Sequence, residues 1–234
     1  LNIISDILDI AKLEEGKLSL ENRFTGLDDI LSNLKNMFEI EAERKNIRLI
    51  FEAGENLPRN IFVDEKRLSQ VLINIISNAI KFTEIGYIKV RIGADYSINE
   101  NAEIIITVED TGIGIPEDFG DRIFKTFQQY MSTSVRNTGA GLGLAVSKKL
   151  VELMNGILTY RSKKNAGTTF TVVLHNMPWN NYEHDHPEHK SIDLSQISFR
   201  DKTILVADDV ETNITLLRAL LKKLGCIVHT AVNG

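Results

Sequence analysis

Three side chains able to bind phosphate or a metal ion recur at helical spacing between residues 74 and 81. Asn74, Asn78 and Lys81 stand at positions i, i+4 and i+7. Carboxamide oxygens suit a hard cation such as Mg²⁺, and the lysine ammonium can pair with phosphate. A solvated helix face is the competing interpretation, although asparagine is a poorer helix former than the glutamate or lysine expected there.

An aspartate and two glycines follow an apolar segment at residues 103–110. Asp110 ends the segment EIIITVED, and Gly112 and Gly114 come directly after it in DTGIGIP. Glycines let a backbone lie close to a flat ligand, and a carboxylate can accept a hydrogen bond from an exocyclic amine such as that of adenine. A hairpin turn would also explain the glycines, but it would not need a buried strand leading into Asp110.

A glycine-rich segment leads into an expected helix at residues 142–155. Gly139, Gly141 and Gly143 alternate in GAGLGL. The free N–H groups and the positive dipole end of such a helix terminus can bind an anion. No Gly-Lys-Ser/Thr follows, which excludes a Walker loop, and no parallel strand leads into the segment, which excludes a Rossmann motif.

The asparagines must be carried by a helix at residues 65–82, for which Asp64 is the expected start. At about 100° per residue, the apolar residues fall on one broad face and the Asn/Lys stripe lies nearly opposite. That apolar face consists of Leu68, Val71, Leu72, Ile75, Ile76, Ala79 and Ile80.

The rest of residues 1–176 mixes helical and strand patterns. Further helices are predicted at 27–45 and 117–127, and strands at 46–54, 87–92, 103–110, 156–162 and 167–175. The last two strands flank a KKNAG turn and are predicted to form a hairpin. Helices mixed with mostly antiparallel strands indicate an α+β sandwich, with the helices on one face of a sheet.

Composition excludes several classes of protein. The hydrophobic content of 43% is typical of a globular domain, and the net charge of −5 argues against direct binding of nucleic acid. No apolar run approaches the roughly 18–20 residues needed to cross a bilayer. Cys226 is the single cysteine, which fits a reducing compartment, so we expect a cytoplasmic protein.

A polar segment without periodicity, residues 177–200, is predicted to be a linker. Its EHDHPEH cluster could bind a metal, although a solvated tether is the simpler interpretation. Residues 202–231 then form one strand–helix–strand unit, whose first strand ends in Asp208 and Asp209. One such unit cannot cover both faces of a parallel sheet, so we expect it to be mobile unless it docks elsewhere.

Taken in order, four segments resemble the N, G1, F and G2 boxes of sensor histidine kinases. They are Asn74-x-x-x-Asn78-Ala-x-Lys81-Phe-Thr, the DTGIGIP that begins at Asp110, Ile123-Phe-x-x-Phe127, and the GAGLGL that begins at Gly139. Residues 202–234 are similar to the beginning of a response-regulator receiver. The combination resembles a hybrid histidine kinase, with a Bergerat-type ATP-binding α/β sandwich and a partial flavodoxin-like receiver.

The resemblance implies a role for each matched residue. Asn78 would coordinate Mg²⁺ with the phosphates of ATP, Asn74 would line the same site, and Lys81 would pair with phosphate oxygens. Asp110 would receive the adenine amine, beneath a mobile lid at about 117–138. The other expected nucleotide contacts are Gly112, Gly114, Ile115, Gly139, Gly141, Leu142, Gly143, Leu144 and Thr168. Asp208 and Asp209 match the Mg²⁺-binding pair of a receiver.

The resemblance also implies domains and partners. Residues 1–20 would end the second dimerisation helix, 21–176 would be the catalytic domain, 177–200 the linker, and 201–234 the beginning of the receiver. The partners would be ATP, a second copy, the chain's own receiver, and a downstream phosphotransfer or regulator protein.

Residues 1–174 contain no histidine. The phosphoacceptor histidine is therefore expected upstream of residue 1, and the phosphoacceptor aspartate of the receiver past Gly234. We expect a fragment that binds ATP without phosphorylating itself.

Two departures from the family pattern leave alternatives open. Thr126 stands where the family often has proline, and Ala140 where a hydroxyl residue is frequent. A pseudokinase or signalling module that holds nucleotide without phosphotransfer is one alternative. Another ATPase of the same fold is a second, against which the receiver-like strand argues.

Overall fold

The computed structural model describes residues 8–9, 11–13, 15–96, 101–117, 119–126, 141–182, 202–208 and 210–231. The chain forms two compact units, residues 1–182 and 183–234. The expected site residues Gly139 and Asp209 lie outside the described residues, as do Phe127, Ala140 and the histidines of the EHDHPEH cluster.

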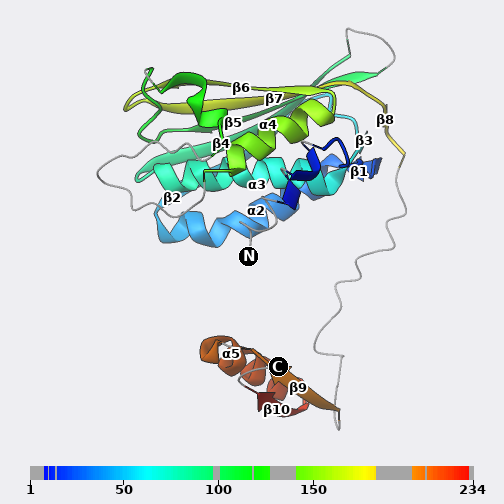
Figure 1. Ribbon diagram of the computed structural model, residues 1–234, viewed down its shortest axis with the longest axis vertical. Coiled ribbons are helices and arrows are strands. Elements are labelled where there is room, and N and C mark those ends of the chain that lie inside the picture. The colour runs from blue at the N-terminus through cyan, green and yellow to red at the C-terminus, as the bar shows by residue number, and fades with distance from the viewer. Residues whose placement is uncertain are drawn as a thin grey trace. The chain divides into compact units, whose positions relative to one another are not determined.

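The first unit is built on a five-stranded sheet of order β2-β4-β5-β7-β6 (Figure 1). Neighbouring strands are antiparallel except β2 and β4, which are parallel. The strands are β2 (Ile47–Ala53), β4 (Gly86–Asp95), β5 (Ala102–Asp110), β6 (Gly156–Lys163) and β7 (Gly167–Met177). Buried and half-buried residues alternate along β5, as a sheet with one covered face requires.

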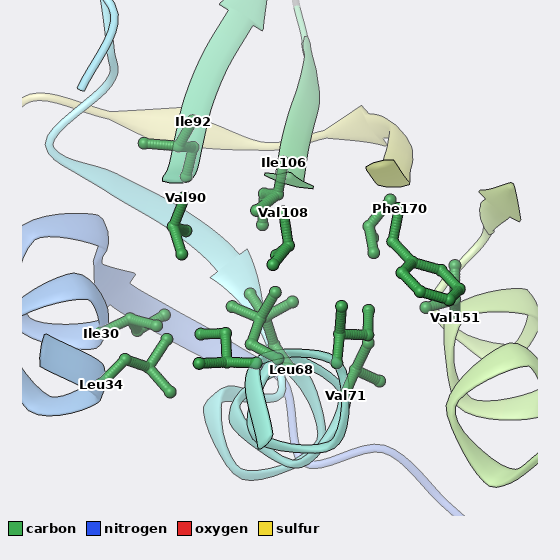
Figure 2. Close-up of a cluster of buried hydrophobic side chains, with 14 of the residues drawn as sticks. Ile30, Leu34, Leu68, Val71, Val90, Ile92, Ile106, Val108, Val151 and Phe170 are labelled. Atoms are coloured by element: carbon green, nitrogen blue, oxygen red, sulfur yellow. The ribbon is translucent and has the colours of Figure 1, made fainter. Parts of the chain in front are cut away.

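Three helices cover that face, α2 (Leu27–Arg44), α3 (Glu65–Phe82) and α4 (Gly143–Leu153) (Figure 1). Figure 2 shows the core between the layers, where Val90 and Ile106 of the sheet point toward Leu68 and Val71 of α3. The predicted α+β sandwich with helices on one face is therefore confirmed.

The apolar face predicted for α3 is the buried face. All seven of its residues are at most 5% exposed. Asp64 begins the helix as expected, because its Oδ1 accepts from the Arg67 N–H at 3.1 Å. Its Oδ2 accepts from the Glu21 N–H at 2.9 Å, which fixes the incoming chain to the start of α3.

The N-terminal segment is held against the same end of α3. Arg67 donates to Asp9 Oδ2 at 2.8 Å, and Gln70 donates to the same oxygen at 3.0 Å. Asp9 is buried. A buried carboxylate needs such partners, so this contact orders the segment that precedes the domain.

The helix predicted at 117–127 was wrong. Among the described residues this stretch contains only a 3₁₀ turn, η1 (Gly120–Phe124). Gly120 has a φ of +46°, a left-handed conformation that a continuous α-helix does not accept.

A second, three-stranded sheet was not predicted. It has the order β1-β3-β8, from β1 (Arg23–Gly26), β3 (Asn60–Val63) and β8 (Trp179–Asn180). Asn60 donates to Asn180 Oδ1 and to the Tyr182 carbonyl, both at 2.8 Å. The first unit therefore extends past the predicted start of the linker at residue 177.

The second unit contains the predicted strand–helix–strand pattern. Its elements are β9 (Thr203–Ala207), α5 (Glu211–Lys223) and β10 (Ile227–Ala231), and the two strands are parallel. Among the helices of the described residues, none has the length and apolarity that a membrane crossing requires.

The double role of Asp64 gives a stability prediction. Asp64→Ala should lower the free energy of unfolding by about 1–3 kcal/mol, because it removes the helix cap and leaves the Glu21 N–H without its acceptor. Urea denaturation measures this loss. Glu84→Ala, an exposed change in a turn, is the control and should leave stability almost unchanged, and an equal loss in both variants would contradict the role given to Asp64.

Candidate functional site

Asp110 is a nearly buried carboxylate at the end of β5. It is 8% exposed, and its Oδ1 accepts from the Gly112 N–H at 2.8 Å and the Thr168 N–H at 3.2 Å. Burial raises the pKa of the Asp110 carboxyl above its usual value, and these two N–H donors partly oppose that shift. Its second oxygen, Oδ2, receives neither of these bonds.

The glycines around Asp110 permit contacts that a side chain would block. A Cβ at Gly112 would lie 2.4 Å from the Phe82 carbonyl oxygen, and one at Gly167 would lie 1.9 Å from the Asp110 carbonyl oxygen. Gly114 has a φ of +65°. The sequence therefore uses glycine where the backbones of α3, β5 and β7 meet, and these backbone contacts explain the glycines without a ligand.

A serine that the sequence analysis missed connects this turn to β6 and β7. Ser162 Oγ accepts from the Ile115 N–H at 2.7 Å and donates to the Gly167 carbonyl at 3.0 Å. It also lies 2.9 Å from Thr168 Oγ1. Ile115 and Thr168 are therefore both bonded to the Ser162 hydroxyl. The sequence does not reveal this role, because a single serine in a strand is common.

The turn is also attached to the C-terminal end of α3. The Ile113 N–H donates to the Phe82 carbonyl at 3.2 Å. Lys45, another residue that the sequence analysis missed, donates its ammonium to the Ile80 carbonyl at 2.6 Å. This cation lies at the negative end of the α3 dipole and satisfies a terminal carbonyl, so it stabilises the end of α3 that carries Lys81.

The start of α4 is attached to the middle of α3. Asn74 Nδ2 donates to the Gly143 carbonyl at 3.2 Å and to Ser147 Oγ at 3.3 Å. Leu142, which precedes the helix, is buried and offers no capping side chain. No side chain of Leu142 therefore caps the first N–H groups of α4, and a helix terminus of this kind can bind an anion.

Helix α3 carries the Asn/Lys stripe and contacts the other two predicted elements, the glycine-led start of α4 and the turn after Asp110. Asn74 contacts the start of α4, and the turn after Asp110 contacts Phe82 at the end of α3. Asn78 and Lys81 lie between these contacts in sequence, both half-buried, with Lys81 Nζ 5.1 Å from the centre of the Phe82 ring.

The remaining predicted site residues lie at the start of α4 and in the second unit. Gly141 has a φ of +69°, and Leu144 is half-buried on the first turn of α4. Asp208 belongs to the second unit, where its Oδ1 accepts from the Val210 N–H at 2.7 Å and from Asn213 Nδ2 at 3.2 Å. The described residues contain no cluster of three or more His, Cys, Asp or Glu side chains suited to a metal.

Comparison with known proteins adds family relationships to this geometry. A family model described as histidine kinase-, DNA gyrase B-, and HSP90-like ATPase matches residues 63–178. The aerobic respiration control sensor protein ArcB of Escherichia coli (strain K12) is 36% identical over 235 residues, which cover 100% of this chain and 29% of ArcB. The signal transduction histidine-protein kinase BarA of the same strain is 39% identical over 171 residues, 73% of this chain and 19% of BarA. The chain thus spans less than a third of these curated relatives.

Two solved structures are similar in fold. Full-length ShkA, in complex with AMPPNP, has a TM-score of 0.66 at 23% identity, over 99% of this chain and 45% of ShkA. ThkA, in complex with the response regulator protein TrrA, has a TM-score of 0.55 at 25% identity, over 74% of this chain and 48% of that one.

The position of Asp110 gives a prediction for binding. Asp110→Asn should weaken binding of adenine nucleotides at least about tenfold, because the amide that replaces Oδ2 cannot accept from the adenine amine. Isothermal calorimetry measures the change. Glu109→Gln is the matched control, because Glu109 accepts from the Tyr87 hydroxyl on the other face of β5. Unchanged affinity in Asp110→Asn would remove Asp110 from the site.

The raised pKa of Asp110 gives a prediction for pH. Between the ordinary value of 3.8 and the higher folded-state pKa, the folded chain binds more protons than the unfolded chain, so its stability falls as pH rises. In Asp110→Asn the side chain does not titrate, so this loss of stability is absent, while its carbonyl oxygen can still accept from the Gly112 and Thr168 N–H groups. Without nucleotide, the variant should therefore be at least as stable as the natural chain at pH 7, and its advantage should vanish near pH 3.8. Thermal unfolding of both chains across pH tests this. The prediction would be contradicted if the stability of Asp110→Asn relative to the natural chain were lower at pH 7 than at pH 4.

Proposed function

Because the chain belongs to the sensor histidine kinases, with residues 63–178 as their ATPase domain, we propose that it binds Mg²⁺–ATP and donates the γ-phosphoryl group to a histidine. The observation that carries the proposal is the attachment of two binding elements to α3. The turn after Asp110 bonds to Phe82, and the start of α4 bonds to Asn74. One helix thereby supports an adenine-type acceptor and an anion-type terminus.

Each residue has a proposed part in binding ATP. Asp110 accepts from the adenine amine, and the turn that contains Gly112 and Gly114 borders the base. Lys81 pairs with phosphate oxygens, which the N–H groups after Gly141 also bind. The family likeness supports Gly139, Leu142, Gly143, Leu144, Ile115 and Thr168 as further contacts.

The donor set on α3 fits Mg²⁺. Asn74 and Asn78 place carboxamide oxygens on a half-buried stripe beside Lys81, and hard cations prefer oxygen ligands. When bound, Mg²⁺ neutralises charge on the phosphate oxygens during phosphoryl transfer. Asn78 is the proposed ligand, and the role of Asn74 is to line the same site.

The proposed reaction moves the γ-phosphoryl group from ATP to a nitrogen of a histidine ring. The bond between the γ-phosphorus and ADP breaks as the phosphorus–nitrogen bond forms. No histidine lies within residues 1–174. By the family likeness, we propose that the acceptor belongs to a dimerisation domain, of whose second helix residues 1–20 would form the end.

We propose that the second unit continues the phosphorelay. Residues 201–234 would begin a receiver domain, with Asp208 and Asp209 as its Mg²⁺ pair. Regulator binding is supported by the likeness to ThkA, whose structure contains the response regulator TrrA. Dimerisation of the parent protein and a cytoplasmic location for this region complete the proposal.

Phosphotransfer in trans tests the proposed function. With labelled ATP and Mg²⁺, the chain should label the histidine of a separately prepared dimerisation domain, and it should not label itself. Asn78→Ala should abolish this transfer and weaken Mg²⁺-dependent ATP binding more than binding in EDTA, without unfolding the chain. Asn36→Ala, an exposed asparagine on α2, is the matched control. Tight ATP binding with no transfer would instead favour a signalling module that only holds nucleotide.

A further inference from the structure

Ser147 is a buried hydroxyl at the contact between α3 and α4. It is 0% exposed, and its buried neighbours on α4 are apolar, including Val146, Leu150 and Val151. Alanine would fill such a position without a polar group to satisfy. The hydroxyl has a partner, because Asn74 Nδ2 donates to it at 3.3 Å. A buried hydroxyl on an otherwise apolar helix face, bonded to a half-buried carboxamide, suggests a role beyond packing.

The same contact determines which end of the Asn74 carboxamide faces α4. Asn74 also donates to the Gly143 carbonyl at 3.2 Å, and a carbonyl can only accept. The NH₂ group must therefore face α4, although an isolated carboxamide could rotate by 180° with little change in shape. The Ser147 hydroxyl alone would not determine the orientation of the carboxamide, because a hydroxyl can either donate or accept.

Gly143 lets the carboxamide lie close to the backbone of α4. A Cβ at Gly143 would come within 3.3 Å of Asn74 Cγ, 3.4 Å of Asn74 Oδ1 and 3.5 Å of Asn74 Nδ2. The contact with Cγ is tighter than most side chains tolerate, so alanine there would displace the whole carboxamide slightly. Gly143 and Ser147 therefore form the two sides of one clamp on Asn74.

We infer that Ser147 is a positioning residue for Asn74. Its hydroxyl, together with the Gly143 carbonyl, accepts from the Asn74 nitrogen and so leaves the Asn74 oxygen outside both bonds, where it lines the site of the cation that accompanies ATP. This inference rests on the proposed function, because it assumes that the Asn74 stripe binds the metal side of Mg²⁺–ATP.

The clamp also fixes the distance between two binding elements. Asn74 belongs to the cation-binding stripe of α3, and Gly143 belongs to the first turn of α4, whose N–H groups can bind phosphate. Because one carboxamide joins them, loosening Ser147 affects the geometry between cation and phosphate ligands. Recognition of adenine at Asp110 does not depend on this clamp.

The test compares Ser147→Ala with the natural chain in Mg²⁺ and in EDTA. Calorimetry should show that Ser147→Ala reduces the gain in ATP affinity given by Mg²⁺ by about 3- to 10-fold, the value of one neutral hydrogen bond. Affinity in EDTA and the midpoint of thermal unfolding should stay unchanged. Ser147→Thr, which keeps the hydroxyl, should restore the gain, and Ser32→Ala, an exposed change on α2, is the matched control.

A double-mutant cycle with Asn74→Ala makes the test independent of how well Ser147→Thr packs. If Ser147 acts through Asn74, adding Ser147→Ala to Asn74→Ala should produce no further loss of the Mg²⁺-dependent gain. In the chain without nucleotide, Ser147→Ala should also shift or broaden the NMR signals of the Asn74 side-chain amide, whereas Ser32→Ala on α2 should not.

The outcomes separate this inference from the proposed function. If the natural chain gains affinity with Mg²⁺ and Ser147→Ala keeps the whole gain, the positioning role is wrong while the proposed function stands. Equal losses in Mg²⁺ and EDTA would assign Ser147 to packing alone and also overturn the inference. If the natural chain binds no adenine nucleotide, both fail together.

Discussion

The buried apolar face of α3 fixes the rotation of that helix about its own axis. Its seven apolar side chains are at most 5% exposed against the sheet and the neighbouring helices. A rotation by one residue, about 100°, would take several of them out of the core and bring polar side chains in. Burial of each large apolar side chain is worth about 1.5–3 kcal/mol, so only one rotation is compatible with this sequence. The polar stripe therefore has a single possible position.

The contacts of α3 with its surroundings follow from that position. Asn74 meets the first turn of α4, where Gly143 has no side chain to interfere. Phe82 presents its carbonyl to the Ile113 N–H, and the bare Gly112 backbone fits beside it. Two segments far apart in the sequence are thus joined to one helix by hydrogen bonds to its backbone and to one carboxamide.

The carboxylate of Asp110 imposes a second constraint. A buried charge needs donors, and here they come from Gly112 on its own turn and Thr168 on the neighbouring strand β7. Register between β5 and β7 places Thr168 opposite Asp110, so a slip of the pairing by one residue would remove this donor. The pairing of the sheet and the chemistry of the turn therefore support each other.

The sequence predicted the elements whose pattern is local. The period of 3.6 gave α3 with its buried face, alternation gave the strand at 46–54, and strand-like segments gave the other strands of the main sheet. The sheet of β1, β3 and β8 was missed because its strands are two to four residues long and pair over long separations. The helix expected at 117–127 failed because Gly120 adopts a left-handed conformation that composition alone does not reveal.

The site was predictable to a similar degree. Asp110, the glycines and the Asn/Lys stripe stood out by residue type and spacing. Ser162, Ser147 and Lys45 did not, because a serine within a strand or helix and a lysine after a helix are common. Their contacts are made across the fold, to Ile115, Asn74 and the Ile80 carbonyl, and only the three-dimensional structure brings those partners together.

The central claim is that the turn after Asp110 and the start of α4 form one nucleotide site through α3. Amide hydrogen–deuterium exchange with increasing Mg²⁺–ATP tests this most directly. The account predicts that protection grows at residues 110–115 and at residues 141–146 with the same dependence on ATP concentration, while residues 203–207 of the second unit stay unchanged. Protection at only one of the two segments, or at the two with clearly different concentration dependences, would contradict it.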